Sequence, residues 1–576
     1  MRRILAASLG AAVVVSVMTG CFAGQPDDDA PARKTSITIE WSNFPNLDPQ
    51  IVTQGMWFDA AGIFEGLVVQ NDAGDDVQPA VAESWDVNED GTVYTFHLRD
   101  TAKWSDGTPV TAQDFAWTYE RLLSPATADT GVTTGANSYQ PSQNIVNAQE
   151  FLAGTITDWS EVGIKVEDEH TIEFTLNSPT PGFLFGLTHP SMLPLQQASL
   201  EEHPEDWQDP ENFVSNGPFT ITAWQVNASM KLVKNAEYWD AGNVALDEIN
   251  VKLVQGFAAG TAAFENGEVD ITAVSQAGDI RRFEQDPELS KRLLAVESNY
   301  YQYLGILRSQ NPLMEDVRIR EALSLALDRK NLATIQPGTT PADSLVFDTV
   351  PGRSEDLGIV EDVKRAKKLL ADAGYPDGQG FPELKILANG ADPALPMLDG
   401  VVDAWKKNLG ITVVVDPQEA GVMATKRFEV QPADYVGFYA GAFGGQPTWS
   451  QTVLTLWNPT VIQTFSMPAG AYQEYLDVQA DTALAAGDKS AKLAAILKEN
   501  ASDEAKEFAE LADEARMATN EDEQVSLFNE AAEVRDKTFL AYSLVYINGY
   551  YAANADLTGV HPRASQWYYF KTIAYK

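Results

Sequence analysis

The sequence predicts a large globular protein of mixed α/β structure that is divided into at least two lobes. Of its 576 residues, 44% are hydrophobic and 10% are aromatic, which is enough to bury substantial cores and excludes a disordered chain. Single hydrophobic cores stop growing at about 250–300 residues, so a chain of this length is expected to form more than one. Apolar residues alternate in some segments and recur at helical spacing in others, which favours a mixed fold.

The charge of the chain excludes one broad class of function. Forty basic residues stand against 82 acidic residues, giving a formal net charge of −42. A field of this sign repels nucleic acid and anionic lipid and keeps the protein soluble, so we expect no nucleic-acid partner. The single cysteine cannot form an internal disulfide.

Residues 1–20 have the pattern of an export signal. Arg2 and Arg3 are followed by an apolar stretch over residues 4–17 and by the small residues at 18–20. The stretch is short for a membrane-spanning helix, which needs about 20 residues. The cysteine that follows, Cys21, resembles the bacterial lipobox, which implies a lipidated new N-terminus; an ordinary signal peptide with an incidental cysteine is the alternative.

The polar segment 21–34, rich in Pro and Asp, is expected to be a flexible tether. Beyond it, the alternation of Ile37, Ile39 and Trp41 predicts a strand. Residues 93–98 predict a second strand after the Asp-Gly turn at 90–91, and a helix is expected to begin at Thr111, with Asp114 completing a capping box.

Two later helices follow the same spacing rules. The segments 315–329 and 361–373 each carry an apolar stripe, and Gly374 supplies a cap for the second helix. Residues 470–535, rich in Ala, Glu, Lys and Asp, predict two or more surface helices.

Several segments together resemble one known family. They are "LDP" at 47–49, "FEGLV" at 64–68, the long block at 79–122, "NGPF" at 216–219, "DVRIREALSLALDR" at 316–329 and "AKKLLADAGYPDGQGFP" at 366–382. In this order they are similar to the extracytoplasmic solute-binding proteins of ABC importers, in the peptide and nickel-binding family. The segments 138–154 and 188–195 resemble the oligopeptide branch.

The resemblance implies a type II clamshell of two lobes, of the kind found in periplasmic binding proteins, with an extra α+β subdomain. Lobe I is then expected to be discontinuous, the extra subdomain to span 51–194, and lobe II to span 306–539. The three parts of lobe I would be residues 35–50, 195–305 and 540–576. Further implications are a monomer without cofactor, held outside the cell membrane or in the periplasm by the lipid at Cys21, with permease and ATPase subunits as partners.

The resemblance also implies the residues that bind ligand. In peptide binders of the family the ligand lies extended and pairs through its main chain with strands of the protein, a form of strand augmentation. Carried over residue by residue, the expected contacts of lobe I and of the chain crossings are Met56, Trp57, Phe58, Tyr139, Tyr303 and Tyr546. Those of lobe II are Ala440, Gly441 and Phe443. For each aromatic residue, packing in a core or on a lobe surface is the alternative.

One position departs from the pattern of the peptide binders. These commonly have a Trp followed three residues later by an Asp that holds the ligand's α-ammonium group. Aligned on Asp434 or Pro447, the two positions here are Ala440 and Phe443; aligned on Tyr439, the acid position is Ala442. A buried ammonium group without an anionic partner is costly. Either another carboxylate compensates or the ligand lacks this group. The glycines of the segment 434–450 permit close approach of a ligand, although a loop explains them as well.

Other functions leave no signature. A hydrolase needs an activated nucleophile, yet the chain has five histidines and no G-x-S-x-G, S-x-x-K or H-E-x-x-H motif. We expect no enzyme activity, with a secreted lipoprotein hydrolase as the remote alternative. The histidines form no ligand cluster, so we expect no metal site. The favoured cargo is an oligopeptide, and sugars, opines and nickel chelates stay open.

Overall fold

The computed structural model describes most of the chain beyond residue 33. The described residues are 34–44, 46–50, 57–125, 145–180, 182–254, 257–297, 299–390, 395–445, 448–454, 457–481, 484, 486–518, 520–563 and 568–576. Residues 35–576 form one compact unit. The predicted signal, Cys21 and the tether up to residue 33 lie outside the described residues. Among the helices of the described part, none combines the length and the apolarity that a membrane crossing requires.

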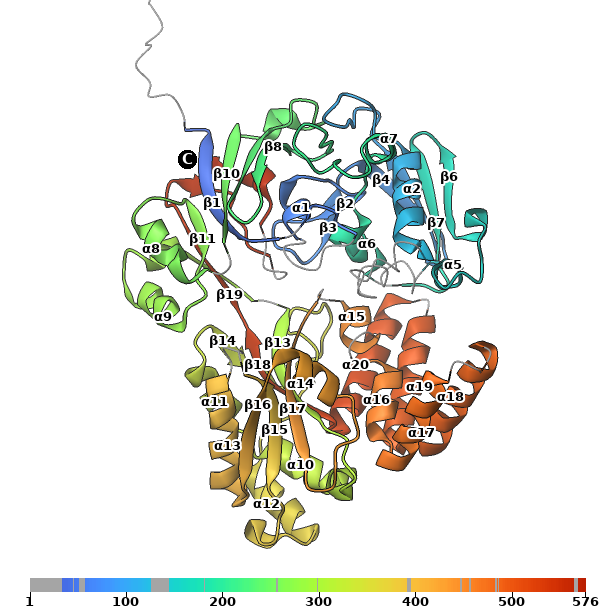
Figure 1. Ribbon diagram of the computed structural model, residues 1–576, viewed down its shortest axis with the longest axis vertical. Coiled ribbons are helices and arrows are strands. Elements are labelled where there is room, and N and C mark those ends of the chain that lie inside the picture. Colours follow the sequence, from blue (N-terminus) through green and yellow to red (C-terminus); the bar gives the residue numbers. More distant parts are fainter. Residues whose placement is uncertain are drawn as a thin grey trace, which may run out of the picture. The chain divides into compact units, whose positions relative to one another are not determined.

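A seven-stranded mixed sheet contains the first predicted strand. Its order is β12-β19-β11-β1-β10-β9-β8, and β1 lies in parallel between β10 and β11 (Figure 1). The prediction for Ile37 and Ile39 is confirmed, because both are buried in β1. The strands are β1 (Ser36–Ser42), β8 (Phe219–Gln225), β9 (Ser229–Lys234), β10 (Glu248–Val254), β11 (Ile271–Ala273), β12 (Leu293–Val296) and β19 (Gly549–Ala553).

A four-stranded antiparallel sheet lies within the range expected for the extra subdomain. It has the order β4-β5-β7-β6, with β4 (Ala82–Val87), β5 (Val93–Leu98), β6 (Ile164–Asp168) and β7 (Thr171–Thr175). The predicted capping box is confirmed: α2 (Ala112–Leu123) begins after Thr111, whose hydroxyl accepts from the backbone N–H of Asp114. Buried residues of this sheet and of the seven-stranded sheet belong to one hydrophobic cluster.

Glu65, from the predicted family motif, is buried in the same half of the chain. Its carboxylate accepts hydrogen bonds from the hydroxyl groups of Tyr238 at 2.5 Å and Tyr569 at 2.9 Å, and from the indole N–H of Trp239 at 2.5 Å. Burial raises the pKa of Glu65, while the three donors and Lys571 oppose that shift. The carboxylate thereby ties three distant segments of the chain together.

A six-stranded sheet is built from strands between Tyr300 and Ile547, and a hydrophobic cluster separate from the first one packs around it. Its order is β14-β18-β13-β17-β15-β16 (Figure 1). The strands are β13 (Tyr300–Ile306), β14 (Thr339–Pro341), β15 (Leu384–Asn389), β16 (Val413–Gln418), β17 (Gly437–Gly444) and β18 (Ala541–Ile547). The glycine-rich segment that a loop would also explain is therefore a strand, β17.

The helices around this sheet include α10 (Val317–Leu325) and α12 (Val363–Asp372), which lie within the predicted segments 315–329 and 361–373. Gly374, with a φ of +101°, follows α12 as expected. The predicted surface helices of 470–535 are α17 to α20, drawn in orange and red in Figure 1. The bounds are α10 (Val317–Leu325), α11 (Arg329–Ile335), α12 (Val363–Asp372), α13 (Leu395–Leu409), α14 (Ala420–Lys426), α15 (Trp449–Leu454), α16 (Pro459–Ser466), α17 (Ala469–Ala480), α18 (Ala486–Asn500), α19 (Asp503–Met517) and α20 (Glu521–Lys537).

Shorter helices accompany the other two sheets. They are α1 (Trp57–Gly62), α5 (Ala148–Leu152), α6 (Phe183–Gly186), α7 (Gln197–Glu202), α8 (Gly260–Glu265) and α9 (Ala277–Gln285), and a two-stranded ribbon pairs β2 (Val68–Gln70) with β3 (Val77–Pro79).

The chain passes between the two large sheets at two places. One lies between Val296 at the end of β12 and Tyr300 at the start of β13, and the other at Asn548, between β18 and β19. The sequence places lobe boundaries a few residues away, at 305/306 and at 539/540. The division into lobes stays a prediction, and the sheets favour boundaries at the two passages.

Candidate ligand-binding site

The topology of the six-stranded sheet indicates where a ligand would bind. β15 pairs in parallel with β16 on one side and with β17 on the other. The connection from β16 to β17 therefore crosses over β15. In open α/β sheets, ligands bind outside the carboxyl ends of parallel strands at such a switch in strand order. We expect the site where β15 ends and α13 begins.

A small hollow lies at this position, and we call it the switch-point pocket. It has a cavity volume of about 10 Å³, which is room for about one water molecule. Ala388 lies near the end of β15, and residues 395–398 form the first turn of α13. The lining residues are Gln302, Tyr303, Ala388, Leu395, Met397, Leu398, Ala440, Gly441 and Leu544. Three of the residues expected from the sequence, Tyr303, Ala440 and Gly441, are thus brought together here.

Two glycines of the paired strands β13 and β17 are each covered by a tyrosine ring from the other strand. Tyr303 pairs with Gly441, and Gly305 pairs with Tyr439. A Cβ atom at Gly441 would lie 2.6 Å from the Tyr303 ring, and one at Gly305 would lie 2.4 Å from the Tyr439 ring. Each ring therefore rests on a glycine of the partner strand, and this contact supports strand pairing where glycine alone would weaken it.

Phe443, at the position of the missing acid, belongs to an aromatic cluster. Its ring stacks on Phe347 at 6.1 Å and lies 5.8 Å from the ring of Tyr301. Phe347 is itself 5.3 Å from Tyr301, and the indole of Trp457 donates to the Tyr301 hydroxyl at 3.1 Å. Phe443 is thus half-buried between rings, and its own side chain offers no anionic partner to an ammonium group.

The loop that carries Phe347 is held by Tyr546 from β18. The Tyr546 hydroxyl donates to the carbonyl oxygen of Val346 at 2.8 Å and lies 3.1 Å from that of Ser344. Tyr546 is 4% exposed, and burial raises its pKa. The structure therefore places this side chain in the core, where it positions the loop.

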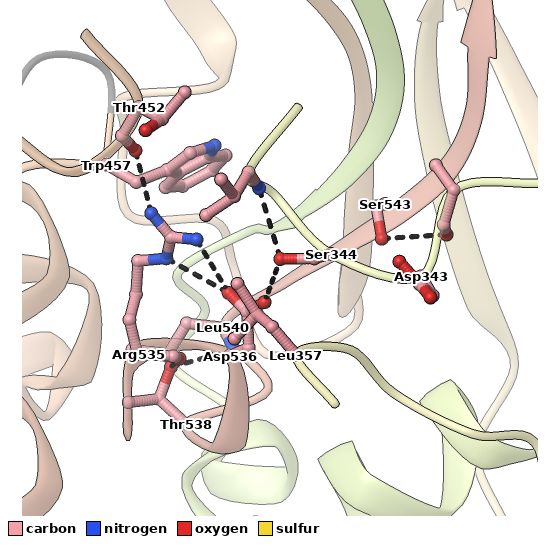
Figure 2. A network of polar contacts seen from close by, with 12 residues as sticks. Asp343, Ser344, Leu357, Thr452, Trp457, Arg535, Asp536, Thr538, Leu540 and Ser543 are labelled. Carbon is pink, nitrogen blue, oxygen red and sulfur yellow. Dashed lines mark hydrogen bonds and ion pairs between the residues drawn. The ribbon is translucent and has the colours of Figure 1, made fainter. Parts of the chain in front are cut away.

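A buried ion pair anchors the same loop from α20 (Figure 2). The guanidinium of Arg535 donates to Oδ1 of Asp536 at 2.9 and 3.0 Å and to the carbonyl oxygen of Thr452 at 2.7 Å. The second oxygen of Asp536 accepts from the hydroxyl of Ser344 at 2.6 Å. Both members of the pair are buried, so each depends on the other for its charge partner.

A carboxylate also follows Phe347 directly in the chain. The side chain of Asp348 is half exposed and lies 3.3 Å from the guanidinium of Arg353, which also contacts Asp343 at 2.8 Å. Burial raises the pKa of Asp348, and Arg353 opposes that shift. Asp348 is thus an acid beside Phe347 in the chain, and its carboxylate is paired with Arg353.

The residues expected from the first part of the chain are placed differently. Phe58 is 1% exposed and packs against Trp41 at 5.3 Å and Phe44 at 5.1 Å, which favours a structural role. Met56, Tyr139 and the side chain of Trp57 lie outside the described residues.

Sequence reasoning missed Gln302, a polar residue that lines the pocket. Gln302 interrupts a run of tyrosines in "YYQYLGI", and a glutamine in such a strand was the available signal. Met397 and Leu398 follow only from the fold, because a helical apolar stripe gives no hint that its first turn borders a pocket. Among the described residues, no three His, Cys, Asp or Glu side chains are grouped in a way that could hold a metal ion.

Comparison with known proteins decides the family. A sequence profile described as "Bacterial extracellular solute-binding proteins, family 5 Middle" matches residues 76–463. The chain belongs to this family. Its members are binding proteins that work outside the cytoplasm, and the predicted family and two-lobed α/β fold class are confirmed.

Individual relatives agree with the family. The chain is 33% identical over 428 residues, 71% of its length and 76% of the relative's, to the periplasmic oligopeptide-binding protein OppA of Escherichia coli. It is 34% identical over 382 residues, covering 65% and 69%, to the probable deoxycholate-binding periplasmic protein YgiS of the same organism. The crystal structure of a periplasmic oligopeptide-binding protein from Borrelia burgdorferi matches with a TM-score of 0.70 and 26% identity, covering 94% of this chain and all of that one.

Proposed function

We propose that this protein is the substrate-binding component of an ABC importer, that it captures oligopeptides outside the cytoplasm, and that it passes them to the permease unaltered. The observation that carries the proposal is the switch-point pocket of this protein. Three residues expected from the family resemblance, Tyr303, Ala440 and Gly441, are among those that line it. A relative that is similar in sequence and another that is similar in structure are both named for oligopeptide binding, which favours a peptide cargo.

Ligand capture requires that the closed form bind better than the open form. The ligand stabilises closure only by that difference in affinity, and the permease then responds to the closed shape. The two passages of the chain, between the end of β12 and the start of β13 and at Asn548, are short in sequence, and we propose that they serve as hinges while the sheets stay rigid. We propose these passages as the lobe boundaries.

Ligand contacts are proposed for the residues around the pocket. Tyr303, Ala440 and Gly441 line it, and Phe443 lies on the same strand β17. Met56, Trp57 and Tyr139 stay proposed contacts from the resemblance. Tyr546 and Phe58 are buried and would act through the elements they support.

A non-peptide cargo is the second candidate, and a specific observation favours it. Phe443 and its ring neighbours stand where peptide binders of the family have an acid, and one relative is named for deoxycholate, an apolar acid. Asp348 is the carboxylate that would receive an ammonium group if the cargo is a peptide with a free amino end.

We propose a binding role without catalysis. A histidine and a serine do meet at 2.8 Å, His189 Nδ1 and Ser191 Oγ, but the same nitrogen accepts from the backbone N–H of Ser191 and caps a 3₁₀ turn. Burial lowers the pKa of His189 to about 4, and Ser191 is fully buried. This arrangement suits a structural cap and leaves no access for a substrate.

The decisive experiment identifies the cargo. Residues 35–576 are purified, denatured to release any bound ligand, and the released material is analysed by mass spectrometry. A set of short peptides supports the proposal, and a single non-peptide species supports the second candidate. Incubation of the native protein with the released cargo should leave its mass unchanged, and a cleaved product would contradict a binding role.

The membrane anchor has its own test. We propose that Cys21 is lipidated, so that a protein with two or more acyl chains stays at the membrane. Cys21→Ser should move the expressed full-length protein from the membrane fraction into the medium or periplasm. An unchanged distribution would favour an ordinary signal peptide.

A further inference from the structure

Gln302, which lines the switch-point pocket, carries a buried hydrogen-bond acceptor that the described part of the chain does not satisfy. The side-chain oxygen Oε1 of Gln302 is buried, and no donor in the described part of the chain lies within hydrogen-bond distance. The residue is 6% exposed. Buried side-chain acceptors are nearly always bonded, because leaving one without a donor costs free energy. The pocket, which has room for a group about the size of one water molecule, can therefore take a single donor group from outside the chain.

The lining that the structure describes carries no charge and favours apolar groups. Gln302 and Tyr303 are its polar side chains, and the rest are aliphatic or glycine. The side chains of Ala388 and Ala440 are small and leave space at the pocket. The side chain of Met397 is flexible and adapts to bound groups of different shape. Among the described residues, no acidic or basic side chain lines the pocket, so an ammonium group placed against this lining would lose its hydration without gaining an anionic partner from it.

We propose that the switch-point pocket is a specificity subsite that reads an uncharged hydrogen-bond donor, an amide N–H or a hydroxyl, through the side-chain oxygen of Gln302. The donor is attached to an apolar group that contacts Met397 and Leu398. This inference rests on the proposed function and names its preferred cargo: peptides whose amino end is blocked as an amide, in preference to peptides with a free α-ammonium group.

The test uses two pools of the same random peptides of two to five residues, one N-acetylated and one with free amino ends. Each pool is applied to immobilised, refolded residues 35–576, and the retained peptides are quantified by mass spectrometry. We expect the acetylated pool to be retained at least about fivefold more, the ratio that one hydrogen bond supplies. Equal or greater retention of the free-amine pool would overturn the proposal.

Variants then test whether Gln302 causes the preference. Gln302→Leu should bring the two pools to equal retention, and Gln302→Glu should shift it towards free amines. Gln473→Leu, exposed on α17, is the matched control and should keep the wild-type ratio. An unchanged ratio in Gln302→Leu, with an unchanged melting temperature, would mean that Gln302 only holds a structural water molecule.

The outcomes separate this inference from the function beneath it. If the folded wild-type protein retains neither pool, the peptide function itself is contradicted. If it retains free-amine peptides in preference, only the subsite is wrong. Because the wild-type ratio is measured without any substitution, a variant that does not fold leaves the main result intact, and Gln302→Met replaces Gln302→Leu in that case.

Discussion

Replacing Asp536 by Asn should destabilise the protein strongly, because it removes the charge partner of a guanidinium that has no access to water. The side chain of Arg535 is 0% exposed, and two of its three hydrogen bonds end on one oxygen of Asp536. Breaking a buried ion pair on one side costs about 3–5 kcal/mol. Ser344→Ala removes one hydrogen bond to the same carboxylate and should cost only about 1 kcal/mol.

Equilibrium unfolding in urea, followed by tryptophan fluorescence, measures these free energies of unfolding. The double variant Arg535→Met with Asp536→Leu should be more stable than Asp536→Asn alone, because no charge is left buried. Asp513→Asn, which removes an exposed partner of Arg516, is the matched control and should change stability by less than about 1 kcal/mol. If Asp536→Asn costs no more than that control, the account of this network is wrong.

Two other substitutions test the packing of the chain. Gly441→Ala should lower the free energy of unfolding by about 1–3 kcal/mol, because its Cβ would lie 2.6 Å from the ring of Tyr303. Gly470→Ala, the control, has open space and should be neutral or stabilising. Equal effects of the two substitutions would refute the contact between the Tyr303 ring and Gly441. Burial raises the pKa of Glu65 above its value in the unfolded chain. The wild type should therefore lose stability relative to Glu65→Gln as the pH rises above about 4.5. A difference in melting temperature between the two proteins that stays constant from pH 4 to 8 would contradict this.

The sequence pattern was sufficient to predict those elements whose structure depends on residues close together in the chain. The strand at Ile37, the capping box of Thr111 and the glycine after α12 depend on residues within a few positions of each other, so their spacing carries the signal. The same holds for the helices of residues 470–535.

The pocket could not be predicted in this way. Glycine weakens a strand, so the segment around Gly441 carries no strand signal of its own, and it is a strand because rings from β13, far away in sequence, cover it. Gln302 has an unsatisfied oxygen only because β17 and α13 surround it. Family resemblance led to Ala440 and Gly441, and the fold was needed to bring Gln302 and Met397 beside them.

Binding at the switch-point pocket is the central claim, and titration calorimetry with a variant that covers the pocket tests it most directly. The best-retained peptide is titrated into wild type, into Ala440→Trp and into Ala494→Trp, which places the same side chain on the exposed face of α18. We predict that Ala440→Trp, once circular dichroism shows that the variant is folded, loses at least about tenfold in affinity, about 1.4 kcal/mol. Affinity equal to that of Ala494→Trp would show that the ligand binds elsewhere.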